Sequence, residues 1–172
     1  MVRKSVKETF ERCATEYDKM IEKIVPYYHE QHEVMLSLIP FRRNDKIKAL
    51  DLGIGTGILG RIILQNFSKS AVDGIDLSEK MIAVCKETLK TFENRFTLSC
   101  GDIEKTDFTS DYDLVVAGLT IHHLTDDAKR NFFRKIYKSL NVNGTFIIRD
   151  IIKSESNRMN EFYHKLWCDF ER

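Results

Sequence analysis

The sequence lacks an apolar run as long as the roughly 18–20 residues that a membrane-spanning helix requires. The first eight residues, Met1 to Glu8, also lack the apolar stretch of a secretory signal. No charge of one sign dominates, because 27 Lys and Arg face 26 Asp and Glu over 172 residues. This balance gives no global field that would attract nucleic acid, although a local basic patch is compatible with it. We therefore predict a cytoplasmic globular protein without membrane contact.

Cysteine and proline are scarce. The four cysteines, at positions 13, 85, 100 and 168, form no Cys-x-x-Cys pair, which predicts free thiols in or near the core and no disulfide or zinc framework. With two prolines and no linker-like stretch, the chain is predicted to be one domain: a helical lid over 1–40, a core over 45–152 and a C-terminal helix over 153–172. His29 and His32 could supply two metal ligands, but no third is evident. We predict a solvated helical face there and no metal site.

Short apolar segments alternate with helical patterns after residue 45. We expect a first helix from about Phe10 to Ile24, ended by Pro26, and a second ended by Pro40. Predicted strands cover 47–52, 71–77, 96–100, 112–118 and 145–152, with amphipathic helices between them. Such alternation favours right-handed crossovers and a doubly wound, Rossmann-like parallel sheet of the α/β class. The order 3-2-1-4-5 puts the first strand at the switch point.

A glycine-rich loop follows the first predicted strand. Gly53, Gly55 and Gly57 allow a sharp turn and close approach of a ligand, and Gly55 to Gly60 also matches the dinucleotide pattern G-x-G-x-x-G. Asp51 argues against a dinucleotide, because its carboxylate would repel the pyrophosphate of that ligand in a site of low dielectric. S-adenosyl-L-methionine has an ammonium and a sulfonium group and no phosphate. It is the predicted ligand, over a dinucleotide or a turn without ligand.

Two more acids follow the next two strands. Asp76 ends the second strand, where a carboxylate can accept hydrogen bonds from both ribose hydroxyls. Its alternative role, capping the next helix, is better suited to Ser78. Asp102 follows the third strand and could accept the adenine amino group between apolar walls from Leu77 and Ile103, although Gly-Asp is also common in ordinary turns.

Four segments together resemble class I S-adenosylmethionine-dependent methyltransferases: residues 49–57, 74–78 with Met81, 101–103 and 112–124. The resemblance implies that Gly53 and its neighbours hold the methionine moiety, Asp76 the ribose, and Asp102 and Ile103 the adenine. Gly118 and Leu119 would lie beside the sulfur. The family usually continues past the fifth strand with strands six and seven. Here only 20 residues follow Ile152. We expect a chain that lacks both strands and forms a homodimer through the exposed fifth-strand edge or the C-terminal helix.

A narrower resemblance is carried by Met20-Ile21, by 25–28 and by 168–172. These segments resemble the tRNA wobble-uridine methyltransferases that use carboxy-S-adenosylmethionine, which implies that Tyr28 contacts the cofactor. The sequence departs from that group in the glycine loop and at Gly118, where asparagine is expected. Ordinary S-adenosylmethionine therefore fits this chain better.

Candidate catalytic residues follow the fourth strand. His122 could act as a base or orient the acceptor, unless the His122-His123 corner serves only packing. Tyr17, Tyr27 and His123 are predicted to wall the acceptor pocket. The sequence thus supports two hypotheses: a methyltransferase acting on a small molecule or a tRNA base, and a domain that binds S-adenosylmethionine without catalysis.

Overall fold

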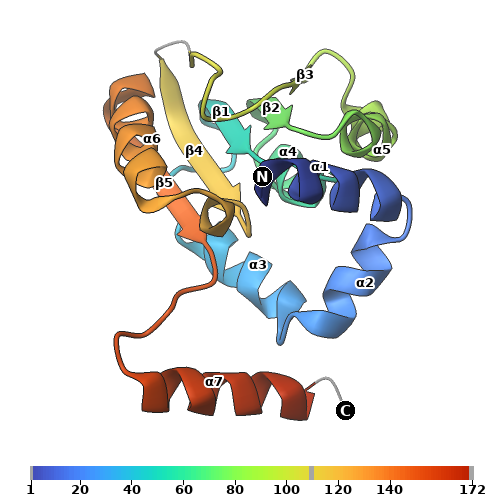
Figure 1. Cartoon of the computed structure of the whole chain (residues 1–172). Helices are drawn as coiled ribbons and strands as arrows, with labels where there is room; N and C mark the ends of the chain where they lie inside the picture. Colours follow the sequence, from blue (N-terminus) through green and yellow to red (C-terminus); the bar gives the residue numbers. More distant parts are fainter. Residues whose placement is uncertain (1, 109–110, 171–172) are drawn as a thin grey trace.

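The computed structural model describes residues 2–108 and 111–170. Three helices come first and a strand–helix alternation follows (Figure 1). The helices are α1 (Val2–Cys13), α2 (Tyr17–Ile24), α3 (Tyr28–Ser37), α4 (Ile58–Asn66), α5 (Glu79–Leu89), α6 (Asp126–Ser139) and α7 (Asn157–Phe170). The strands are β1 (Lys46–Leu52), β2 (Lys69–Asp76), β3 (Phe96–Cys100), β4 (Tyr112–Gly118) and β5 (Leu140–Arg149), and short 3-10 turns cover Lys90–Phe92 and Ile121–His123.

The five strands form one parallel sheet in the order β3-β2-β1-β4-β5, which confirms the predicted fold class. The chain leaves β1 toward β2 and β3 on one side and returns to β4 and β5 on the other. The gap between β1 and β4 is thus the switch point, where ligands of such sheets bind at the carboxyl ends of the strands. Asp51 lies in this position, opposite Gly74 of β2 and Val116 of β4.

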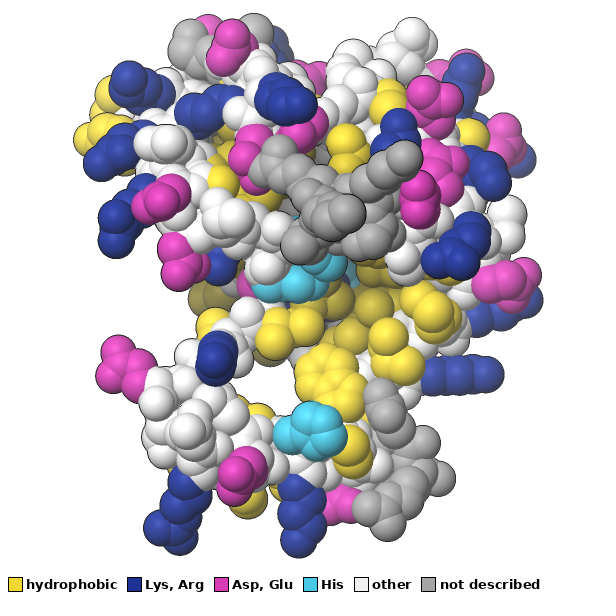
Figure 2. Space-filling view, in the orientation of Figure 1, with side chains coloured by type: hydrophobic (Ala, Val, Ile, Leu, Met, Phe, Trp, Pro, Cys, Tyr) yellow, Lys and Arg dark blue, Asp and Glu magenta, His cyan; other side chains and the backbone are white. Residues whose placement is uncertain are grey.

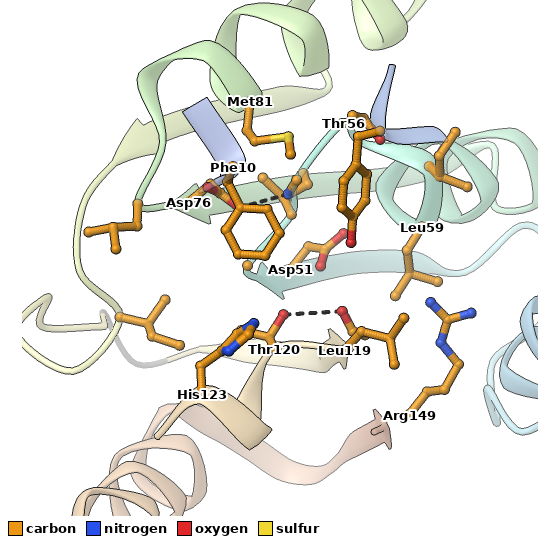
Figure 3. Close-up of a pocket in the computed structure, with 18 of the residues that line it drawn as sticks. Phe10, Asp51, Thr56, Leu59, Asp76, Met81, Leu119, Thr120, His123 and Arg149 are labelled. Carbon is orange, nitrogen blue, oxygen red and sulfur yellow. Dashed lines mark hydrogen bonds between the residues drawn. The ribbon is translucent and has the colours of Figure 1, made fainter. Parts of the chain in front are cut away.

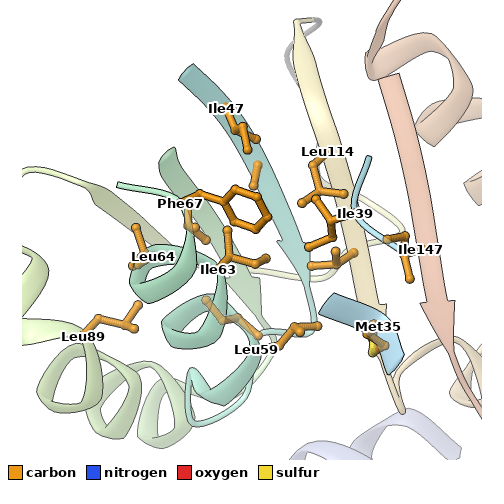
Figure 4. Close-up of a cluster of buried hydrophobic side chains, with 14 of the residues drawn as sticks. Met35, Ile39, Ile47, Leu59, Ile63, Leu64, Phe67, Leu89, Leu114 and Ile147 are labelled. Atoms are coloured by element: carbon orange, nitrogen blue, oxygen red, sulfur yellow. The ribbon is translucent and has the colours of Figure 1, made fainter. Parts of the chain in front are cut away.

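Hydrophobic side chains cover both faces of the sheet. On one face, α3 and α4 pack on β1, β4 and β5 (Figure 4). The stripe of α4 formed by Leu59, Ile63 and Leu64 is buried against Ile47 and Leu114. On the other face, Phe132 and Ile136 of α6 pack with the other side of β1 and β4. Burial on both faces explains why β4 has a continuous apolar run from Leu114 to Ala117.

Local signals set several helix boundaries. Ser78 caps α5 as predicted, because its Oγ accepts the Met81 N–H at 3.2 Å. The predicted helix over 10–24 is wrong in one respect: α1 ends at Cys13 and α2 starts at Tyr17, so the chain bends ten residues before Pro26. Cys85 is buried and all four thiols are free, but Cys100 is exposed rather than near the core.

The fifth strand begins earlier and ends earlier than the predicted 145–152. Asn143 has a φ of 65° inside β5, and the β4–β5 register shifts between Tyr112 and Leu114. The Asn143-Gly144 pair therefore forms an irregularity within the strand. Because β5 ends at Arg149, that side chain and Asp150 emerge at the carboxyl edge of the sheet.

The last helix stands apart from the sheet (Figure 1). Trp167 packs on the α2–α3 cluster, and the Phe170 ring lies 6.1 Å from that of Tyr27. Phe162, Leu166 and neighbouring apolar side chains are exposed, and Figure 2 shows a hollow between this helix and the rest of the molecule. Glu171 and Arg172, part of the narrower resemblance, lie outside the described residues. Over the described part of the chain, we find no helix whose length and apolar character would let it cross a bilayer.

Candidate functional site

A pocket lies at the carboxyl ends of the strands, beneath the N-terminal helices (Figure 3). About 1130 Å³ of empty space lies between its lining residues, a volume that includes space open to solvent. Its wall combines the β1–α4 glycine loop, the ends of β2, β4 and β5, and side chains of α1, α2 and α3. Segments distant in the sequence thus meet around one pocket.

The glycine loop has a backbone that other residues rarely adopt. Gly53, Gly55 and Gly57 have φ values of 72°, 56° and 88°. A Cβ at Gly53 would collide with the Thr120 side chain, and one at Gly57 would lie 2.7 Å from Cys85 Sγ. The loop is therefore held against neighbouring elements as well as turned. It brings main chain to the pocket at Gly53 and Gly55 and starts α4 at Ile58.

Asp51 is the most buried charged group of the pocket, with 1% of its surface exposed. Its Oδ2 has no hydrogen-bond partner among the described residues. Burial, helped by the nearby Asp76 carboxylate, raises the pKa of Asp51 to about 7, while a backbone hydrogen bond from Gly60 and the Arg149 guanidinium act in the opposite direction. A cationic group in the pocket would supply the missing partner.

Asp76 joins two loops that border the pocket. Its Oδ2 accepts the Gly55 N–H and its Oδ1 the Ser78 N–H, both at 2.9 Å. Burial raises the pKa of Asp76, and these backbone hydrogen bonds partly offset that rise. Each carboxylate oxygen has a second lone pair, so the group can still accept bonds from a ligand. Asp102 also lines the pocket, and its Oδ1 accepts the Glu104 N–H at 3.0 Å.

The N-terminal helices are tied to these same loops. Ser78 Oγ donates to Glu11 Oε1 of α1 at 3.0 Å, and Thr56 Oγ1 donates to Asp18 Oδ1 of α2 at 2.5 Å. Between these two bonds, Phe10 projects into the pocket (Figure 3). The helices thus cover the pocket. One hydrogen bond anchors α2 to the glycine loop at Thr56, and the other anchors α1 to the start of α5 at Ser78.

The two histidines after β4 differ in their surroundings. His123 lines the pocket, and its ring lies 5.7 Å from that of Phe10. His122 is not among the lining residues, and its Nδ1 lies 2.5 Å from Asp150 Oδ1. Asp150 Oδ2 also accepts the Ile121 and His122 backbone N–H groups. Burial alone would raise the pKa of Asp150, but the bonds from His122 and the backbone lower it overall.

Comparison with known proteins identifies the family. A family model described as "Methyltransferase domain" matches residues 49–144, more than half of the chain. The chain belongs to the methyltransferase family. It has a class I S-adenosylmethionine-dependent methyltransferase domain, as the four motif segments predicted.

Individual relatives align with different lengths of this chain. A malonyl-[acyl-carrier protein] O-methyltransferase of Priestia megaterium is 32% identical over 116 residues, 67% of this chain, and the chain spans 41% of that protein's length. A carboxy-S-adenosyl-L-methionine synthase of Nautilia profundicola is 24% identical over 162 residues, 94% of this chain and 69% of the relative. Carboxy-S-adenosylmethionine, the ligand of the narrower resemblance, thus recurs in a relative's name.

A solved structure of a DhpI–SAM–HEP complex superposes with a TM-score of 0.73 at 20% identity, covering 94% of this chain and 71% of that one. At this identity the likeness concerns the fold alone.

Most residues predicted to contact S-adenosylmethionine line the pocket: Tyr28, Asp51, Gly53, Gly55, Asp76, Leu77, Met81, Asp102, Ile103, Gly118 and Leu119. Of the predicted acceptor wall, Tyr17 and His123 line it too. Three predicted residues do not: Gly57 lies behind the loop, Tyr27 is 68% exposed, and His122 faces Asp150.

Several pocket residues were not predicted from the sequence, and one prediction was wrong. His32 is buried, with 4% of its surface exposed, and lines the pocket, whereas it was predicted on a solvated face. Its ring lies 4.5 Å from that of Tyr28, four residues earlier on α3, a spacing that could have suggested a shared face. Phe10, Thr56 and Arg149 were also missed. Arg149 ends β5, but the predicted strand continued to residue 152, so the strand-end argument did not reach it.

Proposed function

We propose that this chain binds S-adenosylmethionine in the strand-end pocket and transfers its methyl group to a small-molecule acceptor. One observation carries this proposal: Asp51 is buried at the centre of the pocket with a carboxylate oxygen that lacks a partner. An ammonium or sulfonium group supplies that partner, whereas a pyrophosphate would add repulsion. This favours S-adenosylmethionine over a dinucleotide.

The rest of the pocket fits the same ligand. The left-handed glycine loop leaves room for an amino-acid end at Gly53 and Gly55. Asp76 has lone pairs for the ribose hydroxyls, and Leu77, Met81 and Ile103 offer apolar walls to an adenine ring. These are the roles that the family resemblance implies.

S-adenosylmethionine supplies a methyl group that its sulfonium already activates. The protein must then align the acceptor at roughly 3–3.5 Å and exclude water. Phe10 and Tyr17, held over the pocket by the Glu11 and Asp18 bonds, would exclude water. His123 faces the pocket, so we assign it to acceptor contact, with the His122–Asp150 pair positioning the turn behind it.

The acceptor itself is the finer part of the proposal. The relatives' names mention a malonyl-carrier protein and carboxy-S-adenosylmethionine, and they differ too much to name one acceptor here. The near-zero net charge, +1, favours a small molecule over a tRNA base. A cytoplasmic location and a homodimer through β5 or α7 stay predictions.

Calorimetric titration tests the cosubstrate. We expect S-adenosylmethionine and S-adenosylhomocysteine to bind and NAD not to bind. Asp76→Asn should weaken the affinity for S-adenosylmethionine and for S-adenosylhomocysteine by tenfold or more, since it replaces a charged acceptor of hydrogen bonds. Asp127→Asn, on an exposed carboxylate of α6, is the matched control and should leave binding unchanged. Tight NAD binding that survives Asp76→Asn would overturn the proposal.

Turnover distinguishes a methyltransferase from a domain that only binds. The loaded protein is incubated with a panel of small metabolites and with tRNA, and S-adenosylhomocysteine is quantified by mass spectrometry. Product with a metabolite supports the proposal. Product with tRNA alone, or none with any acceptor, contradicts the small-molecule assignment.

A further inference from the structure

Arg149 brings a positive charge to the end of the pocket farthest from Asp76 (Figure 3). Its Nε and Nη1 are buried and have no hydrogen-bond partner within the described part of the chain. His32 Nδ1, on the wall of the same pocket, is also buried without a hydrogen-bond partner among the described residues. Three buried nitrogens without partners at one end of a cavity are unusual, because buried polar groups in folded proteins are nearly always paired.

Tyr28 holds the guanidinium in place, with a side-chain hydrogen bond that leaves Nε and Nη1 without partners. Its Cζ lies 4.9 Å from the centre of the Tyr28 ring, a cation–π contact. Gly118 leaves room beside it: a Cβ there would lie 3.4 Å from Nη2 and 3.8 Å from Nε. Burial and the charge of Arg149 lower the pKa of His32 to about 4, so His32 is neutral near pH 7 and adds no second cation. The charge of Arg149 lowers the pKa of Asp51, but the two groups form no ion pair.

The unpaired groups define the chemistry of the missing partner. A guanidinium has its donors in a planar fork, which matches the two oxygens of a carboxylate. In arginine, Nε and Nη2 form one such fork and Nη1 and Nη2 form the other, so each fork includes one of the nitrogens without a partner. The apolar side chains of Leu59 and Leu119 lie beside the guanidinium (Figure 3). The charge is fixed by the fold before any ligand arrives.

We propose that Arg149, with Tyr28 and His32, forms a carboxylate-binding subsite at the β5 end of the pocket. Two sources can supply this carboxylate: the amino-acid end of the cosubstrate, or the acceptor. The first source rests on the proposed function, whereas the subsite itself does not.

Binding measurements on the full chain test the subsite. Arg149→Met removes the charge and keeps an apolar stem, Arg149→Lys keeps the charge and removes the fork, and Arg158→Met, on an exposed arginine of α7, is the control. Three probes are titrated: S-adenosylhomocysteine, 5′-methylthioadenosine, which lacks the amino-acid end, and succinate added to the S-adenosylhomocysteine complex. Thermal unfolding of each variant without ligand is recorded in parallel.

A cosubstrate carboxylate predicts a loss of S-adenosylhomocysteine affinity of 10- to 100-fold in Arg149→Met, a smaller loss in Arg149→Lys, and a change under twofold for 5′-methylthioadenosine. An acceptor carboxylate predicts unchanged affinity for both nucleosides and loss of succinate binding in Arg149→Met. In both cases Arg149→Met without ligand should unfold at the same or a higher temperature, since an unpaired buried charge has been removed.

Other results overturn the subsite. Equal losses for both nucleosides, or a lower unfolding temperature in both Arg149 variants, would assign Arg149 to the fold. So would affinities that do not change for any probe. If neither nucleoside binds to the unmodified chain, the proposed function fails. Succinate is then titrated into the protein without nucleoside, and its binding to the unmodified chain but not to Arg149→Met decides the subsite alone.

Discussion

Asp51→Asn tests the buried charge at the centre of the pocket. The substitution keeps the shape of the side chain and removes its titration. Burial raises the pKa of Asp51 from 3.8 to about 7, so the folded protein holds a proton there that the unfolded chain has released. A folded state that binds more protons than the unfolded one loses stability as pH rises, here from about pH 4 through about pH 7.

The size of this effect follows from the pKa shift. At 1.36 kcal/mol for each pKa unit, the ionised carboxylate costs the folded state about 4 kcal/mol in full, and about 2–3 kcal/mol of this arises between pH 5 and pH 8. Asparagine has no such cost. The unfolding free energy of Asp51→Asn minus that of the wild type should therefore rise by about 2–3 kcal/mol over this range, equivalent to roughly 5–10 °C in Tm.

Urea unfolding of both proteins at pH 5, 6, 7 and 8 without ligand measures this difference. Taking the difference cancels the titration of groups that do not interact with Asp51. Asp51→Asn should also lose affinity for S-adenosylhomocysteine. That loss would show that the Asp51 carboxylate serves ligand binding although it lowers the stability of the folded protein. Asp127→Asn, whose exposed carboxylate lies on α6, should give a flat difference. A flat difference for Asp51→Asn would refute the reasoning, because the carboxyl would then not be protonated in the folded state.

Three other substitutions test the supports of the site. Ser78→Ala removes the α5 cap and the bond to α1, and should lower the unfolding free energy by about 1–2 kcal/mol in urea; unchanged stability would argue against both contacts. Gly57→Ala places a Cβ 2.7 Å from Cys85 Sγ at a φ of 88°, and should cost about 1–3 kcal/mol, with partial rescue by Cys85→Ala in thermal unfolding. Asp150→Asn should speed amide exchange at His122 and reduce turnover, with S-adenosylhomocysteine affinity changed less than twofold; an equal loss of affinity would assign it to the cosubstrate site.

The sheet could be predicted because its signals are local. The strands at 96–100 and 112–118 match β3 and β4 residue for residue, since apolar runs bounded by turn residues indicate both their type and their ends. β5 differed because Asn143-Gly144 has the same local preference in a turn and in an irregular strand. Pairing with β4, distant in the sequence, decides between the two.

The site divides in the same way. The glycine loop and the acids at the strand ends were predictable, because each residue acts on the ligand from a fixed place at the edge of the sheet. Thr56, His32 and Arg149 were not, because their place in the pocket depends on how α2 and α3 pack over the strands. His32 shows this most clearly: its own helix reads as mostly polar, and its burial comes from the β5 end and from Tyr28.

The order of charges across the pocket restricts what can bind. Asp76 lies at one side, Asp51 near the centre and Arg149 at the other side (Figure 3). Asp51 and Arg149 each retain atoms without partners, so a ligand that satisfies one and not the other leaves a buried charge unpaired, which costs several kcal/mol. A dinucleotide would place phosphates near the carboxylates, and a nucleoside without an amino-acid end would leave both groups unsatisfied. A molecule with an ammonium group beside a carboxylate satisfies both, and the selectivity then comes from penalties on the alternatives as much as from contacts with the ligand itself.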